Sequence, residues 1–188
     1  MELKDDPINE WANAYIMRTV FVDRDGVINK DTGYVHKIED FEFSEGVFDS
    51  FKYLKSRGFD LIIVTNQSGI GRGYYKEQDF NILTHWMLNR FNEQGIAILD
   101  VLYCPHKQED NCNCRKPRTG MLEEADKKYK IDKKNSWMIG DKESDISAAN
   151  TFGISNTILI KNDRTFLKQK SDAQFILPSL NEISNYIR

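Results

Sequence analysis

The chain has 188 residues, 40% of them hydrophobic, and a formal net charge of −3 at pH 7. This length and composition suit a single soluble domain with a hydrophobic core. The weak acidity argues against a nucleic-acid partner, no apolar run approaches membrane-spanning length, and residues 1–17 lack the apolar core of a secretion signal. We therefore expect a cytoplasmic protein without a membrane partner. The sequence leaves the oligomeric state open, a monomer included.

From Thr19 onward, short apolar runs alternate with amphipathic stretches. This alternation predicts βαβ units with right-handed crossovers, and hence a mostly parallel sheet with helices on both faces. We assign residues 1–17 to an N-terminal extension and residues 18–188 to one domain. The predicted strands span residues 19–22, 60–64, 98–103, 136–139, 156–160 and 175–177. The predicted helices span residues 45–57, 77–94, 119–130 and 143–150, with a terminal helix after Ser179, which has capping-box spacing to Glu182.

Two aspartates, Asp23 and Asp25, directly follow the first predicted strand, and Gly26 marks a sharp turn after them. In an open α/β sheet, ligands collect beyond the carboxyl ends of the strands. Two carboxylates placed there can hold a divalent cation, and one of them can attack an electrophile. For an isolated Asp-x-Asp pair, a charged turn at a strand end is an equally good interpretation.

Other polar groups follow strands or precede helices in the same way. Thr65 directly follows the second predicted strand, where its hydroxyl and the following backbone N–H groups can bind an oxyanion. Lys116, next to Arg115, can neutralise charge on a phosphoryl group. Asp141 can complete an oxygen-rich Mg²⁺ site, and Asp145 can either orient a lysine or interact with the helix dipole. Each group taken alone also fits an ordinary turn or a solvated surface charge.

All three cysteines of the chain lie within one short segment that also contains a histidine. Cys104, His106, Cys112 and Cys114 form the pattern Cys-x-His-x5-Cys-x-Cys. Three thiols and one imidazole match the ligand set of a closed tetrahedral Zn²⁺ site, and four protein ligands indicate a structural role. The alternative is three reduced cysteines that are clustered by chance. Because Arg115 follows directly, metal binding would rigidify the segment that orients the two cations.

The order of these motifs resembles that of the haloacid dehalogenase-like (HAD) superfamily over about residues 18–160. The resemblance implies a three-layer, Rossmann-like α/β fold, and the short connections predict no large cap domain. It also implies that Asp23 is the nucleophile and Asp25 the general acid/base. The implied stabilisers of the phosphoryl group are Thr65, Arg115 and Lys116. The implied ligands of a catalytic Mg²⁺ are Asp23, Asp25 and Asp141, with Lys142 adjacent.

Within that superfamily the chain resembles the heptose 1,7-bisphosphate phosphatases, through residues 23–29, 31–35, 65–73, 104–106, 112–117 and 140–142. This resemblance implies removal of the 7-phosphate of D-glycero-D-manno-heptose 1,7-bisphosphate through an aspartyl phosphate. The reaction belongs to the synthesis of nucleotide-activated heptose for bacterial surface glycans such as lipopolysaccharide. The implied substrate contacts are Asp31, Thr32, Gly33, Tyr34, Thr65, Asn66, Gln67, Ser68, Arg115 and Lys116.

Two alternatives remain open at this point. The five-residue gap between His106 and Cys112 is shorter than in many heptose bisphosphatases and looks more like that of the related histidinol-phosphate phosphatases. Histidinol phosphate or another small sugar phosphate is therefore the alternative substrate. A zinc-containing module that only binds phosphorylated ligands is the non-enzymatic alternative, and such a module would not need an acid/base at Asp25.

Overall fold

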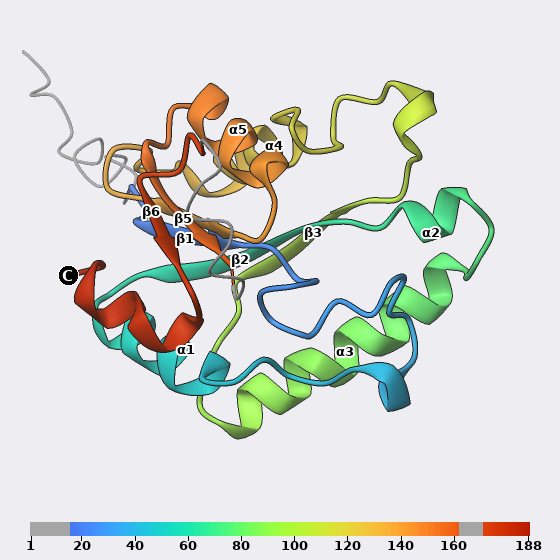
Figure 1. Cartoon of the computed structure of the whole chain (residues 1–188), viewed down its shortest axis with the longest axis horizontal. Coiled ribbons are helices and arrows are strands. Elements are labelled where there is room, and N and C mark those ends of the chain that lie inside the picture. Colours follow the sequence, from blue (N-terminus) through green and yellow to red (C-terminus); the bar gives the residue numbers. More distant parts are fainter. Residues whose placement is uncertain (1–15, 162–170) are drawn as a thin grey trace, which may run out of the picture.

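A computed structural model describes residues 16–161 and 171–188, which contain a six-stranded parallel sheet (Figure 1). The strand order is β3-β2-β1-β4-β5-β6, and each neighbouring pair is parallel. The predicted strands are confirmed, and the second is longer than expected because it includes Thr65 and Asn66. The strands are β1 (Thr19–Val22), β2 (Asp60–Asn66), β3 (Asp100–Cys104), β4 (Trp137–Gly140), β5 (Asn156–Ile160) and β6 (Phe175–Leu177).

Helices cover both faces of the sheet, as the alternating pattern predicts. Helices α1 (Val47–Ser56) and α3 (Glu77–Glu93) lie on one face, and α4 (Gly120–Tyr129) and α5 (Glu143–Phe152) lie on the other (Figure 1). Along β1, Val20 and Val22 pack into the first core while Phe21 packs into the second. Successive side chains of a strand point to opposite faces, so an uninterrupted apolar strand fills both cores.

Two details differ from the expected elements. A four-residue helix, α2 (Ser68–Gly71), forms where we expected only turns. The chain ends in a 3₁₀ helix, η5 (Leu180–Asn185), and the side chain of Ser179 makes no capping hydrogen bond there. Of the predicted extension, residues 1–15 lie outside the described part. Met17 forms a β-bridge with Ile131.

The connections after β1 and β2 contain little regular secondary structure. In the described residues, the segment between β1 and α1 contains a single 3₁₀ turn, η2 (Ile38–Asp40), and α2 lies between β2 and α3. A similar turn, η3 (Gln108–Asp110), follows β3. The described chain therefore has no cap domain, as predicted. It also contains no helix long and apolar enough to span a membrane.

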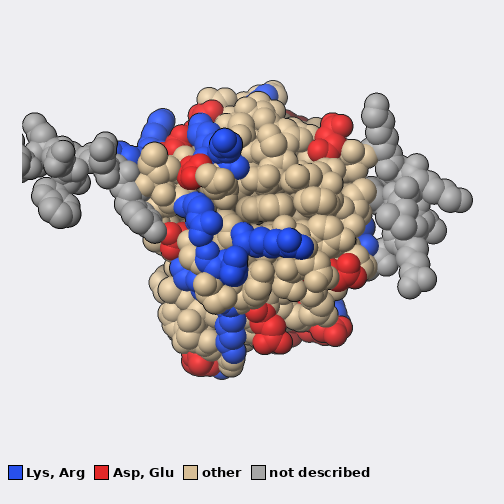
Figure 2. Space-filling view, turned by 90° about the vertical axis from the view of Figure 1, so that its left-hand side faces the viewer, with Lys and Arg blue, Asp and Glu red and all other residues tan. Residues whose placement is uncertain are grey.

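Lys and Arg side chains gather on the face shown in Figure 2, which is the left-hand side of Figure 1. The strands begin at this end of the molecule. Arg18, directly before β1, donates a hydrogen bond through Nη2 to the carbonyl oxygen of Arg57, directly after α1, over 2.7 Å. Because the strands are parallel, their carboxyl ends lie at the opposite end. The cations of this face are therefore remote from the polar groups that follow the strands.

We predict that Phe91→Ala destabilises the fold by about 3–5 kcal/mol, because truncating a buried aromatic ring leaves a cavity. Phe91 is fully buried on α3, and its ring stacks on that of Phe51 of α1 with centroids 5.2 Å apart. Urea unfolding measures the loss. Ile82→Ala is the matched control on α3, since Ile82 is 55% exposed and its truncation should change stability by less than about 0.5 kcal/mol. Equal losses for the two variants would contradict the assignment of Phe91 to the core.

Candidate active site

The carboxyl ends of β1, β2 and β4 bring together polar groups that are far apart in the sequence. Val22 pairs with Ile63 on one side and with Ile139 on the other, so Asp23, Thr65 and Asp141 emerge at the same edge. The backbone N–H of Asp23 donates to the carbonyl oxygen of Ile139 over 2.9 Å, which fixes the exit of β1. A cavity of about 700 Å³ opens here, within the range of small-molecule sites.

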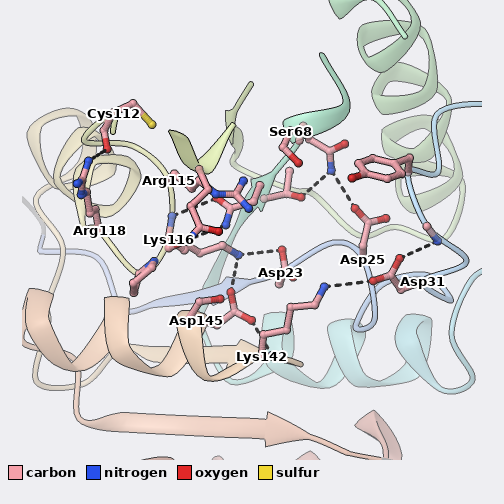
Figure 3. Close-up of a pocket in the computed structure, with 18 of the residues that line it drawn as sticks. Asp23, Asp25, Asp31, Ser68, Cys112, Arg115, Lys116, Arg118, Lys142 and Asp145 are labelled. Carbon is pink, nitrogen blue, oxygen red and sulfur yellow. Dashed lines mark hydrogen bonds and ion pairs between the residues drawn. The ribbon is translucent and has the colours of Figure 1, made fainter. Parts of the chain in front are cut away.

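The Lys116 ammonium lies at the centre of this site (Figure 3). Its Nζ is 2.9 Å from Asp23 Oδ1 and 2.7 Å from Asp145 Oδ1, and it donates to the carbonyl oxygen of Val64 over 2.7 Å. All three charged side chains are buried. Burial lowers the pKa of Lys116, but the Asp145 and Asp23 carboxylates more than offset this, so the pKa lies above its usual value. Lys116 is therefore a permanent cation beside Asp23.

The backbone of Lys116 is held by the side-chain amide of Asn66, at the end of β2. Asn66 Oδ1 accepts a hydrogen bond from the Lys116 N–H over 3.1 Å, and Asn66 Nδ2 donates to the Lys116 carbonyl oxygen over 3.2 Å. Both ends of the amide are therefore used within the protein. In this structure Asn66, which we expected at the substrate, sets the position of the lysine.

Three carboxylates, that of the nucleophile candidate Asp23 included, form an acid cluster in this site. Oxygen atoms of Asp23, Asp141 and Asp145 all lie within 4.8 Å of one another. Asp141 Oδ1 is buried without a hydrogen-bond partner. Gly26 has a φ of +90°, and a Cβ there would lie 2.3 Å from Asp141 Oδ2, so the turn after β1 presses closely on this carboxylate. An orphaned buried oxygen beside two further acids is a fitting place for a hard divalent cation.

Ionisation of this cluster is disfavoured in the protein alone. The pKa of Asp23 is raised to about 8, chiefly by burial and also by Asp145 and Asp141, while Lys116 lowers it. The pKa of Asp141 is also raised, chiefly by burial. A cation bound between these carboxylates would stabilise their ionised forms.

Asp25 is surrounded by hydrogen-bond donors. Arg24, which is 1% exposed, donates through Nη2 to both carboxylate oxygens over 2.9 Å. Asn29 Nδ2 donates to Oδ1 over 3.1 Å, and Gln67 Nε2 donates to Oδ2 over 2.9 Å. The sequence treats Arg24 only as the spacer of Asp-x-Asp, but its side chain turns back to hold the second aspartate. These contacts fix the carboxylate at the wall of the cavity.

The loop after β1 supplies the other side of the cavity. Lys142 Nζ is 3.1 Å from Asp31 Oδ2 and 3.6 Å from Asp141 Oδ2, so this lysine connects the loop to the acid cluster (Figure 3). Although burial raises the pKa of Asp31, the Gly33 N–H and Lys142 lower it below its usual value. Thr32 lies exposed in the same loop but is not part of the cavity wall. The predicted substrate residues that line the cavity are Asp31, Gly33, Tyr34, Thr65, Asn66, Gln67, Ser68, Arg115 and Lys116.

The four predicted zinc ligands form one cluster next to this cavity. Cys104 Sγ lies 3.1 Å from Cys114 Sγ and 3.5 Å from Cys112 Sγ, and His106 Nδ1 lies 3.3 Å from Cys114 Sγ. All three cysteines are free thiols. Ligands at about 2.0–2.3 Å from one tetrahedral ion are separated by roughly 3.5–3.8 Å, close to these distances. The cluster can therefore hold a single metal ion.

Comparison with known proteins agrees with this geometry. A family model described as HAD-hydrolase-like matches residues 113–183. D-glycero-alpha-D-manno-heptose-1,7-bisphosphate 7-phosphatase of Photorhabdus laumondii is 46% identical over 152 residues, covering 77% of this chain and 83% of the relative. The D-glycero-beta-D-manno-heptose-1,7-bisphosphate 7-phosphatase of Haemophilus ducreyi is 42% identical over 178 residues, covering 90% of this chain and 98% of the relative.

Solved structures give the same picture. The crystal structure of D,D-heptose 1,7-bisphosphate phosphatase from B. bronchiseptica, complexed with magnesium and phosphate, superposes with a TM-score of 0.82. The two sequences are 26% identical, and the alignment covers 90% of this chain and 97% of the B. bronchiseptica chain. A putative HAD-like phosphatase from Mesorhizobium loti has a TM-score of 0.79 at 27% identity, covering 90% of this chain and 84% of its own.

We predict that Asp23→Asn increasingly stabilises the Mg²⁺-free protein, relative to wild type, as pH rises from about 4 to 8. The native pKa of about 8 lies above the ordinary aspartate pKa of 3.8, so between these values the native state binds more protons than the unfolded state. By linkage, the stability contributed by this group falls as pH rises through that interval, and the neutral amide removes the loss. Urea titrations at several pH values measure the difference.

Asp49→Asn is the control for this pH series, because Asp49 is an exposed acid on α1. It should show no growing stabilisation with pH. A difference between Asp23→Asn and wild type that stays constant or shrinks with rising pH would contradict the raised pKa of Asp23.

Proposed function

Because the chain belongs to the family of D-glycero-D-manno-heptose-1,7-bisphosphate 7-phosphatases, we propose that it hydrolyses the 7-phosphate of that sugar through an aspartyl phosphate on Asp23. The supporting observation is that Asp23, Thr65 and Lys116 line one cavity, with Asp141 within reach of Asp23. Each of these side chains comes from a different segment of the chain. The relatives include enzymes named for the alpha and for the beta anomer, so we leave the anomer open.

In the first step, an Asp23 carboxylate oxygen attacks the phosphorus atom of the 7-phosphate. The P–O bond to the sugar breaks, and Asp25 in its protonated form gives its proton to the leaving oxygen. The Lys116 ammonium, 2.9 Å from Asp23 Oδ1, reduces the repulsion between the anionic attacker and the anionic ester. The Thr65 hydroxyl and the Arg115 guanidinium donate hydrogen bonds to the phosphoryl oxygens.

In the second step, the ionised Asp25 carboxylate takes a proton from water. The resulting hydroxide attacks phosphorus, the bond between Asp23 and phosphorus breaks, and inorganic phosphate leaves. Asp25 is then protonated again and ready for the next ester. A module that only binds phosphorylated ligands would not need an acid/base at this position. The presence of Asp25 is therefore the reason to favour an enzyme.

The acid cluster fits a catalytic Mg²⁺, because Asp141 Oδ1 is a buried oxygen without a partner and the pKa of Asp23 is raised. Carboxylates of Asp23 and Asp141 with the backbone carbonyl of Asp25 would hold the ion, and Lys142 lies beside it. When bound, the ion supplies positive charge that offsets the charges of the attacking carboxylate and the phosphoryl group. Mn²⁺ accepts the same oxygen ligands.

The Cys/His cluster fits a structural Zn²⁺, because four ligands leave no open position for substrate. Cys114 is followed directly by Arg115 and Lys116. A metal at the cluster would fix the start of the segment that Asn66 holds at its end. We therefore assign the zinc a role in orienting these two cations.

The proposed product still carries its anomeric phosphate. A reaction that transfers a nucleotide to that phosphate would consume it, which places the enzyme in the synthesis of nucleotide-activated heptose for surface glycans. We also place the protein in the cytoplasm.

We predict that phosphate release from D-glycero-D-manno-heptose 1,7-bisphosphate is Mg²⁺-dependent and has a higher kcat/KM than release from histidinol phosphate. Both anomers of the sugar are assayed beside histidinol phosphate, with and without added Mg²⁺. Asp23→Asn keeps the shape of the side chain but loses the nucleophile, and should lower kcat by at least about 10³-fold. Faster hydrolysis of histidinol phosphate would overturn the proposed substrate, and near-normal activity of Asp23→Asn would exclude the covalent route.

We predict that replacing both Cys112 and Cys114 by serine removes the bound zinc and lowers kcat roughly 10- to 100-fold, because the segment that carries Arg115 and Lys116 is then no longer fixed by the metal. Elemental analysis of the purified protein measures the metal. Asn113→Ala is the matched control between the two ligands, since its side chain is exposed, and it should retain both zinc and activity. Unchanged metal content in the double variant would refute the ligand assignment.

A further inference from the structure

We propose that Tyr75 is a positioning residue for the general acid/base, acting on Asp25 through the side-chain amide of Gln67. The inference rests on the proposed function, since it assigns a role within that reaction. Neither the tyrosine nor its partner is marked by the sequence as catalytic. Tyr75 lies in the turn between α2 and α3, and Gln67 lies between β2 and α2.

Every polar atom of the Gln67 amide is used within the protein. Nε2 donates to Asp25 Oδ2 over 2.9 Å and to Thr65 Oγ1 over 2.8 Å, and Oε1 accepts from the Tyr75 hydroxyl over 2.6 Å. Gln67 is only 2% exposed, so water does not compete for these groups. Because Asp25 Oδ2 and Thr65 Oγ1 both accept from Nε2, the NH₂ end of the amide faces Asp25. The oxygen end then faces Tyr75, which must donate.

The tyrosine is well suited to hold this orientation. Its ring is buried, and it stacks on His36 with centroids 4.7 Å apart and planes 4° from parallel. A Cβ at Gly69 would lie 2.1 Å from Tyr75 Cε1, so only glycine at position 69 leaves room for the ring. Burial raises the pKa of Tyr75 to about 12, and the hydroxyl therefore keeps its proton over the working range of an enzyme.

The consequence is a fixed geometry between the proton carrier and the phosphoryl site. Arg24 and Asn29 hold Asp25 from within its own turn, whereas Gln67 holds it from the end of β2. The same NH₂ group contacts Thr65, a candidate ligand of the phosphoryl oxygens. Without the Tyr75 hydroxyl, the amide is free to turn its oxygen toward the carboxylate, and the two oxygens repel. The Asp25 carboxyl group is then no longer held in position to protonate the leaving oxygen.

The test compares substrates whose leaving groups differ in their need for a proton. A sugar phosphate expels an alkoxide and depends on the acid, whereas 4-nitrophenyl phosphate expels a stable phenolate and does not. We expect Tyr75→Phe to lower kcat/KM for heptose bisphosphate about 10- to 100-fold while changing kcat/KM for 4-nitrophenyl phosphate by less than about three-fold. The kcat/KM values report steps up to departure of the alcohol, so the later use of Asp25 as base does not interfere.

Tyr74→Phe is the matched control, because Tyr74 is the adjacent tyrosine, is 59% exposed and contacts Tyr34 through its ring. It should leave both substrates unaffected. In a Gln67→Leu background, adding Tyr75→Phe should cause no further loss, because the two residues act through one contact. Phenylalanine preserves the stacking on His36, and thermal unfolding confirms that the variant is folded.

An equal loss on both substrates would overturn the inference, because it indicates a general structural role. Unchanged activity on both substrates would also overturn it. Full additivity with Gln67→Leu would likewise contradict it. The comparison uses any alkyl phosphate that the wild type hydrolyses, histidinol phosphate included. A wild type that fails to hydrolyse heptose bisphosphate therefore contradicts the proposed substrate and leaves the role of Tyr75 to be judged on the other ester.

Discussion

The buried ion pairs of Lys116 are the interaction on which the site depends. One ammonium contacts Asp23 after β1, Asp145 in α5 and the carbonyl oxygen of Val64 in β2, so a single charge joins three parts of the fold. Removing such a charge from water is costly, and only close partners offset the cost. Asn66 fixes the backbone of the lysine from the end of the same β2 strand. The position of the lysine is therefore set before any substrate arrives.

The same arrangement crowds the carboxylates together. Asp23, Asp141 and Asp145 share one region with Lys116 and Lys142, and Lys161 also lowers the pKa of Asp141, yet burial still raises the pKa of Asp23 and of Asp141. The protein thus holds its acids in a state that favours binding of a further cation. The hydrophobic packing on both faces of the sheet provides the stability that maintains this unfavourable crowding.

The sequence predicts the parts of the site that depend on strand ends. Asp23, Thr65 and Asp141 each follow an apolar run, and a parallel sheet must bring such positions to one edge. It does not predict contacts that depend on side-chain direction. Arg24 turns back onto Asp25, Asn66 binds the backbone of Lys116, and Tyr75 reaches Gln67, all through tertiary packing. The α2 helix was missed because its glycines suggest turns. The capping box predicted at Ser179 was wrong, and only a 3₁₀ helix follows this residue.

The absence of a cap among the described residues has a consequence for how such an enzyme changes over evolutionary time. In the proposed mechanism the chemistry is carried by strand ends and by one lysine, whereas residues of the loops after β1, β2 and β3 line the cavity. Loops on the surface tolerate insertions better than the sheet does. A lineage can therefore change its substrate specificity by lengthening or shortening one loop, while the catalytic residues stay the same.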